Sequence, residues 1–166
     1  FGTKEDFQTL CLEGKKRGIQ ILLDGVFNHT GSDSIYFNRK GTYDSVGAYQ
    51  SQESDYYSWF NFFEYPNKYD CWWGIDTLPA LREENPSYME FIAGEEGIGT
   101  RWLKAGASGW RLDVAAELPD VFPEKLRESV KRYNPEALII GEVWEDASNK
   151  IAYDKRKQYF LGKQLD

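Results

Sequence analysis

Hydrophobic and polar positions along the chain follow two patterns that alternate. Thr3 opens a capping-box pattern, Thr-Lys-Glu-Asp, in which Asp replaces the usual Glu or Gln. It predicts a helix through about Arg17 with its apolar residues on one face, and Gly18 ends that helix. Residues 19–23 then form a nearly continuous apolar run, which is typical of a strand covered on both faces in a parallel sheet.

The alternation resumes at Asn85. This residue is a suitable helix cap and Pro86 suits the first helical position, so a helical region is predicted from here to Gly106, with one glycine interruption at 94–99. The elements expected after it are a strand at 109–114, a helix at 121–133 and a strand at 137–140. Helices that alternate with buried strands predict an α/β fold with a parallel sheet.

A long segment without either pattern separates the first strand from Asn85. Residues 30–84 are too many for an ordinary loop, which predicts an insertion with a function of its own. The expected organisation is a segment at 1–29 with a helix and a strand, the insertion at 30–84, and a segment at 85–166 with the remaining elements.

Composition narrows the class of protein. A length of 166 residues with 41% hydrophobic residues suits one domain with a substantial core. The net charge of −7 disfavours nucleic acid and anionic membranes as partners, because both attract Lys and Arg. No apolar run approaches the roughly 18 residues of a membrane span. The chain opens inside a helix pattern without Met, so we expect its natural N-terminus upstream.

The two cysteines, Cys11 and Cys71, lie far apart and in no metal-binding spacing. They fit a reducing compartment or simple burial, and a disulfide between them remains an alternative. We expect a cytoplasmic protein.

Each of the three predicted strands ends in a carboxylate: Asp24, Asp113 and Glu142. The carboxyl ends of parallel strands are where ligands meet such sheets. One buried carboxylate is easily an accident, but three at equivalent positions predict the floor of one acidic pocket. Arg111 shares a strand face with Asp113 and would pair with a carboxylate. For an Arg-x-Asp pair taken alone, a structural ion pair is the simpler interpretation.

Three short motifs stand at these strand ends: Asp24-Gly-Val-Phe-Asn28-His29, Gly109-Trp-Arg111-Leu-Asp113 and Gly141-Glu142-Val-Trp144. Together and in this order they resemble the motifs of the α-amylase family of glycoside hydrolases. The resemblance implies that the chain is part of a TIM (β/α)8 barrel, about strands 3 to 5 with their helices. It implies an inserted subdomain after the first of these strands.

Within the family, Glu117 and the stretch Thr-Leu-Pro-Ala-Leu at 77–81 resemble the neopullulanase, cyclomaltodextrinase and maltogenic amylase group. Two positions depart from that group. It more often has His at the position of Glu145, and a Met-Pro-Lys-Leu-Asn-like run in place of residues 78–81. Both positions are near the substrate in the family, so the exact bond cleaved stays open.

Carried over by position, the resemblance makes Asp113 the nucleophile and Glu142 the general acid, later the base. It implies sugar contacts for Arg111, His29, Glu117 and Trp144, and a supporting role for Asp24 and Asn28. No cofactor and no metal site are predicted. Calcium is known in parts of the family, and Asn28 is similar in position to one of its ligands, but calcium is not predicted here.

The expected charge states of Asp113 and Glu142 follow from the different roles that the resemblance gives them. A retaining glycosidase needs one ionised and one protonated carboxyl group, roughly 5 to 5.5 Å apart. Arg111 is expected to keep Asp113 ionised. Desolvation beside Ile140 and Trp144, together with the like charge of a neighbouring acid, is expected to raise the pKa of Glu142.

The resemblance implies retaining hydrolysis of α-glucosidic bonds in starch-derived oligosaccharides by double displacement. An α-glucanotransferase would use the same residues, so the motifs do not separate the two reactions. A non-catalytic relative that binds sugar or acts as a scaffold is a third hypothesis, which the presence of Asp113, Glu142 and Arg111 disfavours. A dinucleotide site is not predicted, because no Gly-x-Gly-x-x-Gly follows any of the three strands.

The insertion is rich in aromatic residues: Tyr56, Tyr57, Trp59, Phe60, Phe62, Phe63, Tyr65, Tyr69, Trp72 and Trp73. Flat aromatic faces suit sugar rings, but for any one of them packing into a small core is the simpler expectation. The chain holds no His-Asp motif of the family's seventh strand. We therefore expect a fragment of a longer enzyme that is inactive alone, with self-association through exposed strand edges as one outcome.

Overall fold

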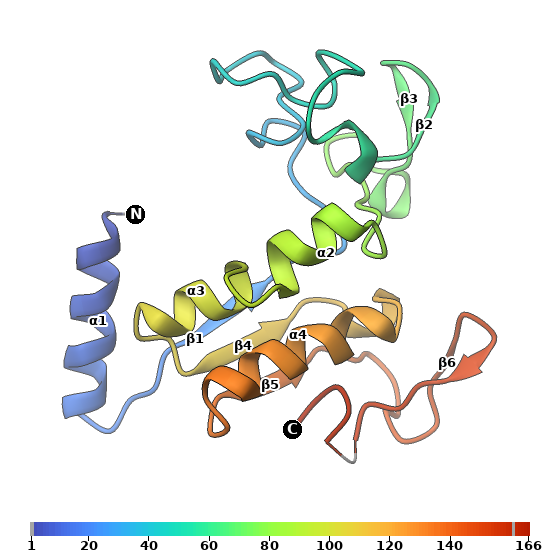
Figure 1. The fold of residues 1–166 in the computed structure, drawn as a ribbon. Coiled ribbons are helices and arrows are strands. Elements are labelled where there is room, and N and C mark those ends of the chain that lie inside the picture. The colour runs from blue at the N-terminus through green and yellow to red at the C-terminus, as the bar shows by residue number, and fades with distance from the viewer. Residues whose placement is uncertain (1, 161) are drawn as a thin grey trace. The chain divides into compact units, whose positions relative to one another are not determined.

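The computed structural model describes residues 2–160 and 162–166, which form two compact units (Figure 1). The first unit holds the described residues through Gly25 and from Met89 to Asp166, and the second holds Val26–Tyr88. The predicted insertion at 30–84 falls within the second unit. No helix among the described residues has the length and apolar character needed to cross a membrane.

The described residues form four α-helices, three short 3-10 helices and seven strands. In chain order they are α1 (Lys4–Lys16), β1 (Leu22–Gly25), η1 (Tyr57–Trp59), β2 (Phe62–Glu64), β3 (Lys68–Tyr69), η2 (Trp72–Gly74), α2 (Pro86–Ala93), α3 (Ile98–Lys104), β4 (Gly109–Leu112), η3 (Ala115–Glu117), α4 (Val121–Tyr133), β5 (Leu138–Gly141), β6 (Ile151–Ala152) and β7 (Lys155–Arg156).

A parallel sheet forms the centre of the first unit. Its order is β1-β4-β5, with β4 in the middle and both pairings parallel. The register aligns Asp24 with Arg111, and Arg111 with Ile140. The predicted α/β fold with a parallel sheet is confirmed.

Local signals set the bounds of α1. The Thr3 hydroxyl accepts the Asp6 N–H, and the Asp6 carboxylate accepts the Thr3 N–H at 2.7 Å, which completes the predicted capping box. At the other end Gly18 adopts a φ of +72°, and the Ile19 N–H donates to the Gly14 carbonyl at 2.9 Å. This arrangement is a Schellman motif.

The first strand lies later in the chain than predicted, at Leu22–Gly25 instead of 19–23. The Ile19 N–H is bonded to the Gly14 carbonyl at the end of α1, and the residue is 55% exposed. It therefore belongs to the helix cap and not to the sheet. The other two strands also differ slightly from the predictions, because β4 ends at Leu112 and β5 runs from Leu138 to Gly141. The helix predicted at 121–133 matches α4.

The sheet is covered on one face only within the described residues. Trp110, Leu112 and Ile139 are buried on that face, and the Trp110 Nε1–H donates to the Gly99 carbonyl of α3 at 2.9 Å. Figure 1 shows α3 and α4 along this side of the strands. On the opposite face Leu138 and Ile140 remain 41% and 40% exposed. Cover on both faces was predicted for residues 19–23, of which Ile21, Leu22 and Leu23 are half-buried.

The second unit is built around aromatic side chains and little regular structure. Phe37 is fully buried, and its ring contacts the rings of Tyr49, Phe60, Phe62 and Tyr69. Packing is thus the role of most aromatic residues of the insertion, as the simpler expectation had it. Phe63 and Trp73 differ, because they are 70% and 64% exposed.

The remaining sequence signals have clear outcomes. The Asn85 Oδ1 accepts the backbone N–H groups of Ser87 and Tyr88, so the predicted cap of α2 is present. The predicted interruption separates α2 from α3. Cys11 and Cys71 are free cysteines, Cys11 buried in the first unit and Cys71 half-buried in the second.

Candidate active site

One guanidinium group organises the carboxyl end of the sheet. Arg111 Nη1 lies 2.6 Å from Asp24 Oδ1 and 2.7 Å from Asp113 Oδ1, and Nη2 lies 2.9 Å from Glu142 Oε2. The Arg111 and Glu142 side chains are each 31% exposed, and that of Asp113 is 21% exposed. The cluster is therefore a half-buried charge network. Its ion pairs are stronger than exposed ones, because water is partly excluded from them.

The register of the parallel strands explains why these groups meet. Asp24 of β1 is the direct neighbour of Arg111 in β4, so their side chains leave the same face of the sheet. Asp113 follows two residues after Arg111 and returns to that face, and Glu142 directly follows β5. The carboxylates of the three strand ends thus meet around Arg111 as predicted. Of these side chains only Glu142 lines the cavity described below, so the predicted pocket floor of three carboxylates is not formed in that cavity.

The backbone beside Glu142 has an unusual conformation. Val114 adopts a left-handed φ of +42°, which costs a β-branched residue of the order of 1–3 kcal/mol. In this conformation the Val114 N–H donates to Glu142 Oε2 at 3.1 Å, and the next N–H, of Ala115, donates to the Glu142 carbonyl at 3.0 Å. The turn after β4 thus fixes both the side chain and the backbone of Glu142.

The charge state of Glu142 differs from the sequence-based expectation. The Val114 N–H lowers its pKa most, followed by the Trp144 side chain, while desolvation raises it and Arg111 and Asp113 lower it further. The net shift is downward, whereas desolvation and like charge were expected to raise this pKa. The reason is that Glu142 keeps contact with solvent and receives direct hydrogen bonds to its charged form.

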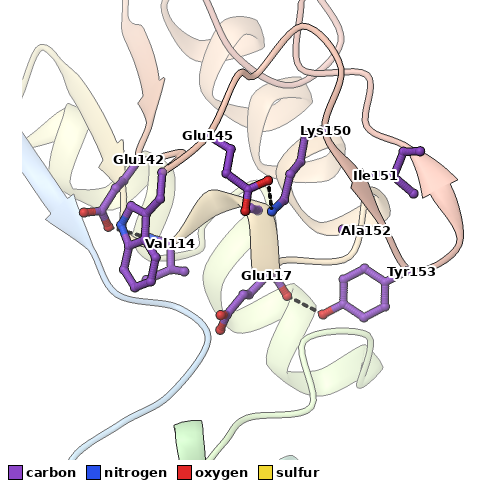
Figure 2. Close-up of a pocket in the computed structure, with 10 residues that line it drawn as sticks. Val114, Glu117, Glu142, Glu145, Lys150, Ile151, Ala152 and Tyr153 are labelled. Atoms are coloured by element: carbon purple, nitrogen blue, oxygen red, sulfur yellow. Dashed lines mark hydrogen bonds and ion pairs between the residues drawn. The ribbon is translucent and has the colours of Figure 1, made fainter.

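A cavity of about 280 Å³ lies next to Glu142 (Figure 2). Its lining comes from three segments and consists of Val114, Ala116, Glu117, Glu142, Trp144, Glu145, Lys150, Ile151, Ala152 and Tyr153. Glu117 and Trp144, both predicted to contact substrate, are therefore part of one pocket with the proposed acid. Aromatic faces and several hydrogen-bonding side chains in one cavity suit a ligand with both apolar and hydroxyl surfaces.

The outer wall of this pocket was not predicted. It is the hairpin of residues 150–157, which contains β6 and β7 and which we call the pocket hairpin. Lys150 Nζ lies 2.9 Å from Glu145 Oε2, and the Tyr153 hydroxyl donates to the Glu117 carbonyl (Figure 2). Short strands of two residues leave no periodic pattern in the sequence, so only the structure reveals this wall.

His29 and Asn28 belong to the second unit. Asn28 is 4% exposed, and its carbonyl accepts the Leu81 N–H at 3.0 Å. His29 forms a β-bridge with Ala80, and its imidazole stacks on the Trp72 ring with centroids 5.0 Å apart. The sugar contact of His29 and the supporting role of Asn28 stay predictions.

The described residues contain no group of three or more His, Cys, Asp or Glu side chains arranged to hold a metal ion. The acidic cluster at the sheet edge instead has the Arg111 guanidinium at its centre.

Comparison with known proteins identifies relatives along nearly the whole chain. It is 41% identical to an amylopullulanase of Thermoanaerobacterium saccharolyticum over 93% of this chain, and 35% identical to neopullulanase 2 of Thermoactinomyces vulgaris over the same share. The chain spans 13% and 26% of the length of these two curated relatives. The subgroup named from the sequence is thus represented among the relatives, and amylopullulanases join it.

Solved structures are similar in fold. One match is the cyclic α-maltosyl-(1→6)-maltose hydrolase of Arthrobacter globiformis, solved in complex with cyclic α-maltosyl-(1→6)-maltose. Its TM-score is 0.81 at 26% identity, over 100% of this chain and 35% of that chain. The debranching enzyme of Nostoc punctiforme matches with a TM-score of 0.78 at 32% identity, over 97% and 31%. The family model described as "Alpha amylase, catalytic domain" matches residues 1–163. The chain therefore belongs to the α-amylase family of glycoside hydrolases.

Proposed function

We propose that the protein carrying this chain hydrolyses α-glucosidic bonds of starch-derived oligosaccharides with retention of configuration. The observation that carries the proposal is the placement of Asp113 and Glu142 on the two terminal nitrogens of one guanidinium, at the ends of neighbouring parallel strands. Such paired carboxylates are the machinery of retaining glycosidases. The finer fold we propose is that β1, β4 and β5 correspond to strands 3, 4 and 5 of a (β/α)8 barrel.

In the first step Asp113 attacks the anomeric carbon while the bond to the leaving oxygen breaks. Glu142 donates its proton to that oxygen, and a covalent glycosyl ester on Asp113 results. In the second step Glu142 takes a proton from water, whose oxygen displaces Asp113 from the anomeric carbon. Arg111 holds both carboxyl groups in place through its two terminal nitrogens.

The lowered pKa of Glu142 has a consequence for this cycle. The carboxyl group must carry a proton when substrate is bound, although the free site favours the charged form. A sugar that occupies the pocket would remove water from Glu142, and this desolvation acts against the charged form. We propose that substrate binding itself loads Glu142 with its proton.

The test is a pair of substitutions in the full-length gene product. Asp113→Ala and Glu142→Gln should each lower kcat on maltooligosaccharides by about 10⁴-fold or more, because each removes a group that reacts directly. Sodium azide should rescue Asp113→Ala and yield a glycosyl azide, since a small anion fits the vacated space. Asp44→Asn, an exposed carboxylate of the second unit, is the matched control. Near-normal turnover by either active-site variant would refute its role.

Product analysis separates the related reactions. At high oligosaccharide concentration a hydrolase yields shorter sugars only, whereas a glucanotransferase also yields longer ones, because a sugar hydroxyl replaces water in the second step. A protein that binds oligosaccharides but leaves them intact would instead be a binding or scaffold module.

A further inference from the structure

A buried lysine joins the pocket hairpin to the rest of the first unit. The Lys157 side chain is 1% exposed, and its Nζ lies 2.6 Å from Asp120 Oδ1 and donates to the Leu118 carbonyl at 2.7 Å. A charged amine is buried only at a large cost unless it is paired and hydrogen-bonded. This one is paired, and its partners lie between η3 and α4, outside the hairpin.

The same residue also closes the hairpin on itself. The Lys157 N–H donates to the Lys150 carbonyl at 2.9 Å, and the ammonium lies 5.8 Å from the ring centroids of Tyr153 and Tyr159. Lys150 and Tyr153 both line the pocket. Lys157 therefore contacts two residues of the pocket wall without lining the pocket itself.

The segment that holds the partners of Lys157, Leu118 and Asp120, also contributes a residue to the pocket lining. Residues 117–120 run from the last residue of η3 to the start of α4, and we call them the linker. Glu117 of the linker lines the pocket, and its carbonyl accepts the Tyr153 hydroxyl. Asp120 additionally accepts the Gln164 Nε2–H at 3.1 Å. Two ties, one at Tyr153 and one at Lys157, thus set the separation between the pocket hairpin and the linker.

We propose that Lys157 is a positioning residue that fixes the pocket hairpin against the linker and so sets the affinity of the pocket for the sugar unit bound beside Glu142. This role rests on the proposed function only for the identity of the ligand. Val114 and Arg111 hold Glu142 independently of the hairpin. Loss of Lys157 should therefore weaken binding and spare the chemical step.

The test compares Lys157→Met with Lys155→Met in the full-length gene product. Lys155 lies on β7 of the same hairpin but is exposed, so it is the matched control. Lys157→Met should raise KM for maltooligosaccharides about tenfold with kcat changed less than about twofold, because uniform binding is lost. Simple destabilisation would instead lower the amount of active enzyme and leave KM unchanged, and that result would overturn the proposal.

Hydrogen exchange supplies a readout that does not depend on activity. In the free Lys157→Met protein, amides of residues 150–157 should exchange about tenfold faster, while those of α4 keep their protection. Unchanged exchange in the hairpin would overturn the proposal. If the wild-type protein proves not to cleave α-glucans, the proposed function fails, and the exchange result still decides the role of Lys157.

A second variant covers the case in which Lys157→Met does not fold. The double variant Lys157→Met/Asp120→Asn removes both charges and leaves an acceptor for Gln164, which avoids an unpaired buried carboxylate. It should show the same rise in KM and the same faster exchange. Wild-type values for both in the folded double variant would refute the proposal.

Discussion

At the scale of single residues, Arg111 is the group on which the acidic site depends. It contacts Asp24, Asp113 and Glu142 at once, and the hydrogen bond with Asp24 is the main cause of its own raised pKa. Without it, three carboxylates would face one another at the sheet edge and repel. A single side chain therefore orients Asp113 and Glu142, the nucleophile and the acid of the proposed mechanism.

Substituting Arg111 tests this role. Arg111→Met should lower kcat/KM by about a hundredfold, comparable to the loss of one well-placed charged donor. Since Arg111 lowers the pKa of Glu142, its removal should also move the basic limb of the kcat/KM profile to higher pH. Arg132→Met, which breaks only the exposed pair with Glu128, is the control. An unshifted basic limb would show that Glu142 is not the group that titrates there.

At the scale of elements, the contact between β4 and β5 depends on a residue without a side chain. Gly109 opens β4 with a φ of +156°, and a Cβ atom built on it would lie 2.1 Å from the Leu138 carbonyl oxygen. No other residue type fits that approach, because the neighbouring atom is backbone and cannot turn away. This close approach is part of the β4–β5 register that places Glu142, directly after β5, beside Arg111.

Gly109→Ala should therefore be severely destabilising, with a loss of unfolding free energy above about 3 kcal/mol, because the two strands must separate. Urea titration followed by circular dichroism measures the loss. Gly31→Ala is the control, since a Cβ there meets no atom within 4 Å. Equal stability of the two variants would contradict the backbone clash.

At the scale of the whole molecule, the outer edge of β5 is partly closed. The Asp166 N–H donates to the Ile139 carbonyl at 2.9 Å, and its carboxylate accepts the Ile139 N–H and pairs with Arg127 and Lys131 of α4. The sequence-based expectation of bare strand edges is thus wrong at this edge. Burial raises the pKa of Asp166, but the Lys131, Ile139 and Arg127 contacts outweigh it, and the net shift is downward.

This shift predicts a dependence of stability on pH. A carboxyl group with a lowered folded pKa contributes stability that is complete above its ordinary value of 3.8 and is lost as pH falls through the folded value. Asp166→Asn should therefore reduce the unfolding free energy near pH 7 and flatten its decline below pH 4. Urea titrations between pH 2 and pH 7 measure this, and parallel curves for variant and wild type would contradict it.

The chain studied alone is expected to lack turnover. Its sheet has three strands in the described residues, and the face that carries Leu138 and Ile140 remains exposed. The same face carries Asp24 and Arg111, so the partly exposed apolar side chains lie beside charged ones, and such apolar surface favours association between copies. Size-exclusion chromatography with light scattering and a maltooligosaccharide assay on residues 1–166 test both statements. A monomer with ordinary glycosidase turnover would contradict the expectation.

The sequence by itself determined the features that rest on local chemistry. The caps at Thr3 and Asn85, the end of α1 at Gly18 and the whole of α4 follow from side chains and backbones within a few residues of one another. The motifs likewise identified the family and the carboxylates at the strand ends. These signals are legible because each needs only neighbours in the chain.

Tertiary structure alone decided the rest. The strand bounds depend on which segments pair, and the left-handed Val114 is held by its contact with Glu142. The largest cause of the downward pKa shift of Glu142 is the N–H of Val114, 28 residues earlier in the chain, although Trp144 close by contributes as well. The pocket hairpin depends on a buried Lys157 that looks like any surface lysine in the sequence. Each of these properties depends on contacts between segments that are distant in the sequence. Solvent access and the geometry of the partners decide them, and both exist only once the chain has folded.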